Sequence, residues 1–146
     1  MNDVLEEVTS ETITKDHVTK RVNDWVDRLN DLYVQLESWL PKGWHVDRQH
    51  FELMDEKMMQ RFNIRPRKIP ILDLKSDAGR SASLKPRGLW IIGVNGRVDM
   101  IVSPKHFLIV DRAKNFAPAE WHIINFYDRD EDRKLSKSTL ANALIA

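Results

Sequence analysis

The chain has 146 residues, of which 42% are hydrophobic and 31% are charged; this balance excludes a disordered protein and fits one domain with its own core. Its 23 Lys and Arg residues nearly balance 22 Asp and Glu residues, so the overall charge favours neither nucleic acid nor a membrane surface as partner. The absence of cysteine excludes disulfides, thiolate catalysis and cysteine-ligated metal sites, and we expect a cytoplasmic protein.

The N-terminal segment 1–13 is acidic and has little apolar pattern, so we expect a flexible leader ahead of a single domain over 14–146. The segment has neither the basic start nor the apolar run of a secretory signal. No stretch approaches the roughly 18 apolar residues of a membrane span, and we expect no membrane partner.

A long amphipathic helix is expected from Thr14 onward. Thr14 is a suitable N-cap, and Pro41 with Gly43 ends the helix. Apolar side chains recur at helical spacing, at Val18, Val22, Trp25, Val26, Leu29, Leu32, Tyr33, Leu36, Trp39 and Leu40.

The next region is less regular. Residues 44–66 predict a short helix with Leu53, Met54, Met58, Met59 and Phe62 on one side. A methionine-rich patch serves either as core filling, which we favour, or as an adaptable binding surface. Residues 68–75 (KIPILDLK) are typical of a strand, and 76–83 (SDAGRSAS) of a turn and loop.

The segment GLWIIGVNGRVDMIV, residues 88–102, predicts a hairpin with a two-residue turn at Asn95 and Gly96. This turn sets Ile91 opposite Met100 on a wholly apolar face. The alternate face is also mostly apolar, because it holds Trp90, Ile92, Val94 and Ile101.

The meander continues beyond that hairpin. A second turn over 103–106 sets Val102 opposite Phe107, and residues 121–127 (WHIINFY) supply a further strand with apolar side chains on both sides. Near the C-terminus, Ser136 is a suitable cap for a short helix whose start is stapled by Leu135 and Leu140.

The expected fold is therefore α+β: a long N-terminal amphipathic helix packed on an antiparallel β-meander of about four or five strands, with a short C-terminal helix. Because both sheet faces look apolar, each needs a cover. The long helix covers one face. The other is covered either by short segments of the same chain, which we favour, or by a second copy in a homodimer.

No motif for catalysis, metal or cofactor binding is recognisable. His45 and His50 are five residues apart, which does not place both on one helical face as a zinc helix needs. The glycines of GVNG fit a tight turn better than phosphate binding. An enzyme stays an alternative, with an acid–base pocket formed by Trp90, Arg97, Asp99, Asp111 and His122.

The most unusual local feature is the basic segment 61–87, where eight Lys and Arg residues against two Asp residues give a net charge of +6. Such a segment is a solvated loop at a sheet edge, a phosphate-neutralising surface, or a binding surface for an acidic protein. We favour a small non-catalytic interaction or regulatory protein that binds an acidic protein partner through this loop and the adjoining sheet edge, with nucleic-acid binding as the alternative. The expected partner-binding residues are Arg65, Arg67, Lys68, Arg80, Lys85 and Arg87.

Overall fold

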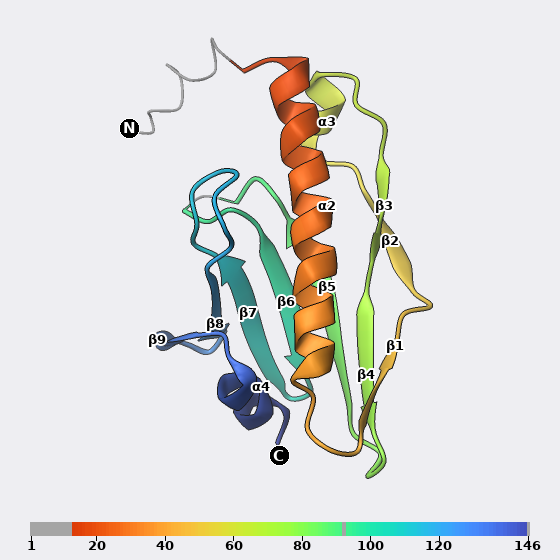
Figure 1. The fold of residues 1–146 in the computed structure, drawn as a ribbon, viewed down its shortest axis with the longest axis vertical. Helices are drawn as coiled ribbons and strands as arrows, with labels where there is room; N and C mark the ends of the chain where they lie inside the picture. The colour runs from red at the N-terminus through yellow and green to blue at the C-terminus, as the bar shows by residue number, and fades with distance from the viewer. Residues whose placement is uncertain (1–12, 92, 146) are drawn as a thin grey trace.

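The structure is a computed structural model that describes residues 13–91 and 93–145, so nearly all of the expected leader lies outside the described residues. Its elements in chain order are α2 (Lys15–Ser38), β1 (Trp44–Asp47), β2 (Phe51–Met54), α3 (Lys57–Arg61), β3 (Arg67–Pro70), β4 (Leu72–Ser76), β5 (Ser81–Gly88), β6 (Arg97–Val102), β7 (Lys105–Asp111), β8 (Trp121–Asn125), β9 (Asp128–Lys134) and α4 (Lys137–Leu144). The fold is α+β, with a long helix, a large antiparallel sheet and a short C-terminal helix (Figure 1).

α2 forms where the sequence predicted a helix. The hydroxyl of Thr14 accepts a hydrogen bond from the backbone N–H of His17 at 3.1 Å, which caps the first turn. No helix in the described ranges is long and apolar enough to cross a membrane. The apolar stripe of α2 is buried, at Val18, Val22, Trp25, Leu29, Leu32, Tyr33 and Leu36.

The main sheet has seven antiparallel strands in the order β1-β4-β5-β6-β7-β8-β9, more than the four or five expected. One missed strand is β9, whose sequence DRDEDRK is exposed along its whole length. It carries no apolar alternation, which is the signal that identifies a half-buried strand. Hydrogen bonding to β8 makes it a strand in the absence of that signal.

β2 and β3 form a separate two-stranded ribbon that continues the β1–β4 pair (Figure 1). The two pieces join where the backbone N–H of Ile71 donates to the carbonyl of His50 at 2.9 Å. The expected strand 68–75 is therefore divided at Ile71 between two sheets. The expected helix within 44–66 is reduced to α3, because its first part pairs with β3 as β2.

The segment 76–83 is not a loop, because only 77–80 lie outside strands and β5 begins at Ser81. β4 and β5 pair as an antiparallel hairpin with Leu72 opposite Leu84. The middle of the basic segment is thus part of the sheet, and its side chains alternate between the two sheet faces.

The expected hairpin within 88–102 does not form. β6 pairs with β5, so Met100 lies opposite Leu84 rather than Ile91. Residues 89–91 and 93–96 belong instead to the connection between β5 and β6, which has an isolated bridge between Ile91 and Val94.

More distant groups satisfy the backbone of this connection. The N–H groups of Leu89 and Trp90 donate to the Glu56 carboxylate, with their shortest contacts at 3.0 and 3.3 Å. The N–H of Asn95 donates to the carbonyl of Asp111 at 2.7 Å. These partners replace the ladder that a tight Asn-Gly hairpin would provide.

The second expected turn exists with a different register. Val102 lies opposite Lys105 and Met100 opposite Phe107, so the shift from the expected pairing is two residues. A shift of two leaves every side chain on its expected face. At the C-terminus, α4 begins after Ser136, whose hydroxyl accepts from the N–H of Thr139 at 3.2 Å, as the sequence predicted.

α2, α4 and the β2–β3 ribbon contribute to one core cluster on a single face of the main sheet. The opposite face carries no helix of the described chain, so the favoured expectation that short segments of the same chain cover it is wrong. Among the described residues, its buried apolar cluster consists of Leu108, Val110 and Ile124, against which Val94 and Phe126 pack. We call this side the open face; its side chains from β4 to β7 are Asp73, Lys75, Ser83, Lys85, Arg87, Arg97, Asp99, Ile101, His106, Leu108 and Val110.

Candidate functional site on the open face

The open face is built around one buried carboxylate, that of Asp99 on the central strand β6. Arg97 donates to both of its oxygens, at 2.7 and 3.0 Å, and Nε2 of His106 lies 3.0 Å from Oδ2. Nε of Arg87 stands 3.8 Å from the same oxygen. Three strands therefore direct nitrogen groups at one carboxylate.

The carboxylates of Asp73 and Asp99 lie closer to the sheet than the nitrogen groups around them. The side chain of Asp99 is 9% exposed, whereas that of Arg87 is 60% exposed. Asp73 is likewise less exposed than its partner His50, whose Nδ1 lies 2.6 Å from Oδ2 of Asp73. A partner that approaches this part of the face meets hydrogen-bond donors before it meets acceptors.

Four histidines in all are paired with aspartates along this face and its rim. The pairs are His45–Asp77, His50–Asp73, His106–Asp99 and His122–Asp132. None of these histidines hydrogen-bonds to a serine or threonine hydroxyl within the described ranges, so no nucleophile–base pair is formed there. The described part of the chain contains no group of three or more His, Asp and Glu side chains placed to hold a metal ion.

No family model, curated protein or solved structure matches this chain. The function of the site must therefore be inferred from its geometry.

The expected partner-binding residues do not form one loop. Lys85 and Arg87 lie on the open face of β5, both exposed. Arg80 lies in the β4–β5 turn. The remaining three belong to the ribbon region: Arg65 precedes β3, Arg67 donates to Asn23 of α2, and Lys68 lies over the ring of Phe51.

The expected pocket residues are also divided. Arg97 and Asp99 are in direct contact, and His122 lies on the same face two strands from Asp99, bound to Asp132. Asp111 points to the helix-covered face and binds Arg28 of α2 at 2.6 Å. Trp90 lies in the connection before β6, where Arg21 stacks over its ring. These five side chains do not converge on one cleft.

Sequence reasoning missed His106 and Lys75 as members of the open face. His106 stacks on Phe126, with ring centroids 4.2 Å apart, and completes the surroundings of Asp99. A two-residue turn at Ser103 and Pro104 would have placed it opposite Ile101, next to Asp99. Lys75 could have been found from the strand alternation of 72–76.

A buried arginine without a carboxylate partner lies behind the connection 89–96. Arg21 donates to Oδ1 of Asn95 at 3.0 Å, but its Nε has no partner in the described part of the chain. Burial lowers the pKa of Arg21, and the nearby Asp24 opposes this shift. We expect Arg21→Met to raise the free energy of unfolding by about 1 kcal/mol in urea titrations, because no ion pair in the described residues offsets the desolvation of this guanidinium, and that gain outweighs the hydrogen bond lost at Asn95.

Arg28→Met is the matched comparison. Arg28 is on the same helix and equally buried, at 8% exposure, but it binds both Asp24 and Asp111. Its replacement leaves a buried carboxylate without its cation and should destabilise the protein. Equal losses in the two variants would contradict the assignment of Arg21 as the unpaired one.

Proposed function

We propose that this chain is a small non-catalytic interaction or regulatory protein that binds the acidic surface of a partner protein through its open face. The observation that carries the proposal is the arrangement around Asp99, with carboxylates against the sheet and Lys85 and Arg87 exposed above them. An acidic side chain on a partner would accept hydrogen bonds from Lys85 and Arg87 and form ion pairs with them. A chain without cysteine suits the reducing cytoplasm, where we expect it to act.

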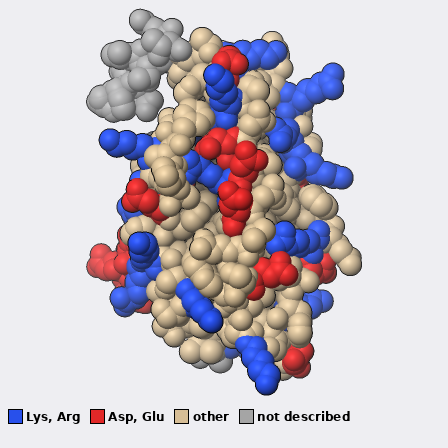
Figure 2. All heavy atoms as spheres, viewed as in Figure 1, with Lys and Arg blue, Asp and Glu red and all other residues tan. Residues whose placement is uncertain are grey.

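Charge complementarity also favours this face over the helix side. Asp24, Asp27 and Asp31 follow one another on the outer side of α2, and Figure 2 shows acidic side chains gathered along the middle of that helix. An acidic partner is repelled there. The open face lies on the other side of the sheet and presents the exposed cations of β4 and β5.

A protein partner fits this surface better than nucleic acid. The open face mixes cations with the carboxylates of Asp73, Asp99 and Asp132, whereas a phosphate backbone requires a continuous basic track. Lys85 and Arg87 alternate with Ser83 on the same strand face, so β5 offers no aromatic ring on which bases could stack.

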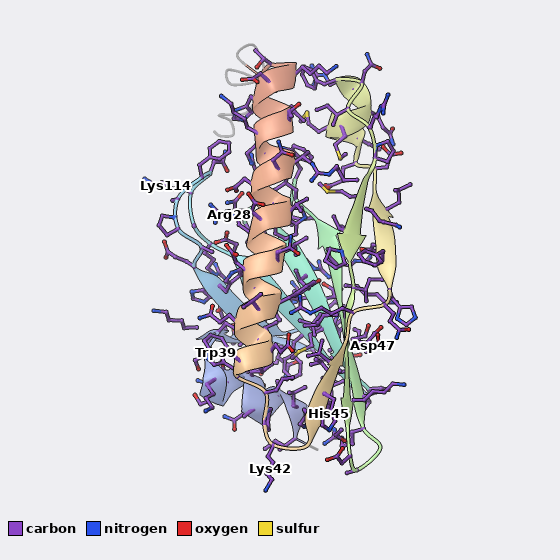
Figure 3. The ribbon with its side chains drawn as sticks, turned by 45° about the vertical axis from the view of Figure 1, so that its right-hand side comes forward. Arg28, Trp39, Lys42, His45, Asp47 and Lys114 are labelled. Carbon is purple, nitrogen blue, oxygen red and sulfur yellow. The ribbon has the colours of Figure 1, made fainter. Side chains whose placement is uncertain are left out.

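The proposal is tested with a fluorescent poly-glutamate peptide as the acidic probe. Fluorescence anisotropy should show binding to the wild type at low salt. The double variant Lys85→Glu/Arg87→Glu should weaken it by about tenfold or more, since each reversal replaces an attraction with a repulsion. The control is Lys42→Glu/Lys114→Glu, which has the same net charge but changes exposed residues away from the open face (Figure 3), and it should bind as the wild type does.

Three results would overturn the proposal. The first is equal loss of binding in both double variants. The second is tighter binding of single-stranded DNA than of poly-glutamate with a steep salt dependence, which would assign the face to nucleic acid. The third is a dimeric mass by light scattering that becomes monomeric in Lys85→Glu/Arg87→Glu, which would show that a second copy covers the face.

A further inference from the structure

A cavity of about 270 Å³ lies between α4 and strands β7, β8 and β9, on the sheet face opposite the open face. Its apolar lining comes from Phe107, Ile123 and Ala143, one residue from each of β7, β8 and α4. A cavity of this size, partly open and with an apolar floor, suits a ligand about as large as a single aromatic ring with one substituent.

The polar part of the lining carries a net positive charge. Lys105 and Arg133 line the cavity together with one acid, Glu131, and neither cation forms an ion pair within the described residues. The Glu131 carboxylate already accepts from the amide of Asn125 at 3.3 Å. The ammonium of Lys105 donates to a backbone carbonyl, that of Ile145, which leaves its charge uncompensated.

The surroundings of Lys105 disfavour its charged form. Burial lowers the pKa of Lys105, and the positive charge of Arg80 lowers it further. Glu131 is the acid that lines the cavity with it, and Arg133 is the second cation. A bound anion would relieve the repulsion among these cations and offset the cost of desolvating Lys105.

We propose that this cavity binds a small organic carboxylate, whose charged end meets Lys105 and Arg133 and whose apolar body lies on Phe107, Ile123 and Ala143. A guanidinium forms paired hydrogen bonds with a carboxylate, and an ammonium adds a single strong one. A monoanion is preferred to a phosphate ester because Glu131 repels a second negative charge. The proposal is independent of the function proposed for the open face.

Benzoate is the probe, with benzamide as its neutral analogue of the same shape. Titration of the wild-type protein followed by two-dimensional NMR should show benzoate binding with a dissociation constant of about 1 mM, as the small size of the ligand allows. The shifted signals should belong to β7, β8, β9 and α4. Benzamide should bind about tenfold more weakly, since it lacks the charge.

Arg133→Gln should weaken benzoate binding by about tenfold, and Lys134→Gln should leave it unchanged. The two residues are adjacent on the exposed strand β9. Lys134 lies opposite His122 in the register of β8 and β9, so its side chain is on the open face. Ala143→Leu should also abolish binding by filling the cavity, provided that its circular dichroism spectrum is that of the wild type. Equal effects of the two β9 variants, equal affinity for benzamide, or no benzoate binding at all would each overturn the proposal.

Discussion

Asp111→Asn is expected to lower the free energy of unfolding by about 3 to 5 kcal/mol, because it leaves the buried guanidinium of Arg28 without the fully buried one of its two counterions. Asp111 is fully buried, and its Oδ2 accepts from Arg28 at 2.6 Å. Its Oδ1 accepts from the backbone N–H groups of Ala113 and Glu120, each at 2.9 Å. One carboxylate thus holds α2, the end of β7 and both ends of the loop 112–120 together.

This loop follows β7 beside α2, as the positions of Arg28 and Lys114 show in Figure 3. Arg28 also donates to the carbonyl of Ala117 in the middle of the loop. Asparagine has the shape of aspartate but turns an amide toward Arg28 or toward the loop N–H groups, so at least one donor loses its acceptor. The loss therefore reports the charge and its hydrogen bonds and not the volume of the side chain.

Asp132→Asn is the control, measured by the same urea-induced unfolding at neutral pH. Asp132 also binds an arginine at 2.6 Å, but its side chain is 30% exposed and Arg112 is 41% exposed. Solvent-screened pairs contribute about 0 to 1 kcal/mol. Similar losses for Asp111→Asn and Asp132→Asn would mean that burial of the Arg28 pair does not set its importance.

The elements that the sequence predicted correctly are those fixed by local chemistry. α2 and α4 have a side-chain cap at the start and apolar residues at helical spacing, and both signals lie within the element itself. Strand partners are set over longer distances. The Asn-Gly pair is a strong local hairpin signal, yet Glu56 and Asp111 bind the backbone of the connection 89–96 instead.

The pairing partner assigned to β6 determines which residues the sequence predicts on the second sheet face. In the expected hairpin, Trp90 and Ile92 faced Ile101 and Asp99, which made the second face appear apolar and in need of a cover. In the structure Ser83 and Lys85 lie opposite Ile101 and Asp99. The basic segment was recognised from charge alone, but its placement on a sheet face required the pairing of β5 with β6.

Gly96→Ala is expected to lower the free energy of unfolding by about 3 to 5 kcal/mol, combining a conformational cost with a steric one. Gly96 has a φ of +110°, which side-chain-bearing residues rarely adopt. An added Cβ would also overlap Cζ3 of Trp25 and lie 2.6 Å from its Cη2. Trp25 belongs to α2 and its side chain is fully buried in the core, so it cannot move aside without opening a void.

Gly79→Ala separates the two costs, because Gly79 has a similar φ of +88° in the β4–β5 turn but nothing within 4 Å of an added Cβ. It should cost about 1 kcal/mol, the conformational part alone. Replacing Trp25 by Leu should then reduce the penalty of Gly96→Ala toward that of Gly79→Ala, since the clashing ring is gone. If the penalty of Gly96→Ala were the same in both backgrounds, contact with Trp25 would not explain why residue 96 is glycine. The positive φ of Gly96 would then be the reason, as it is for a glycine in a tight turn.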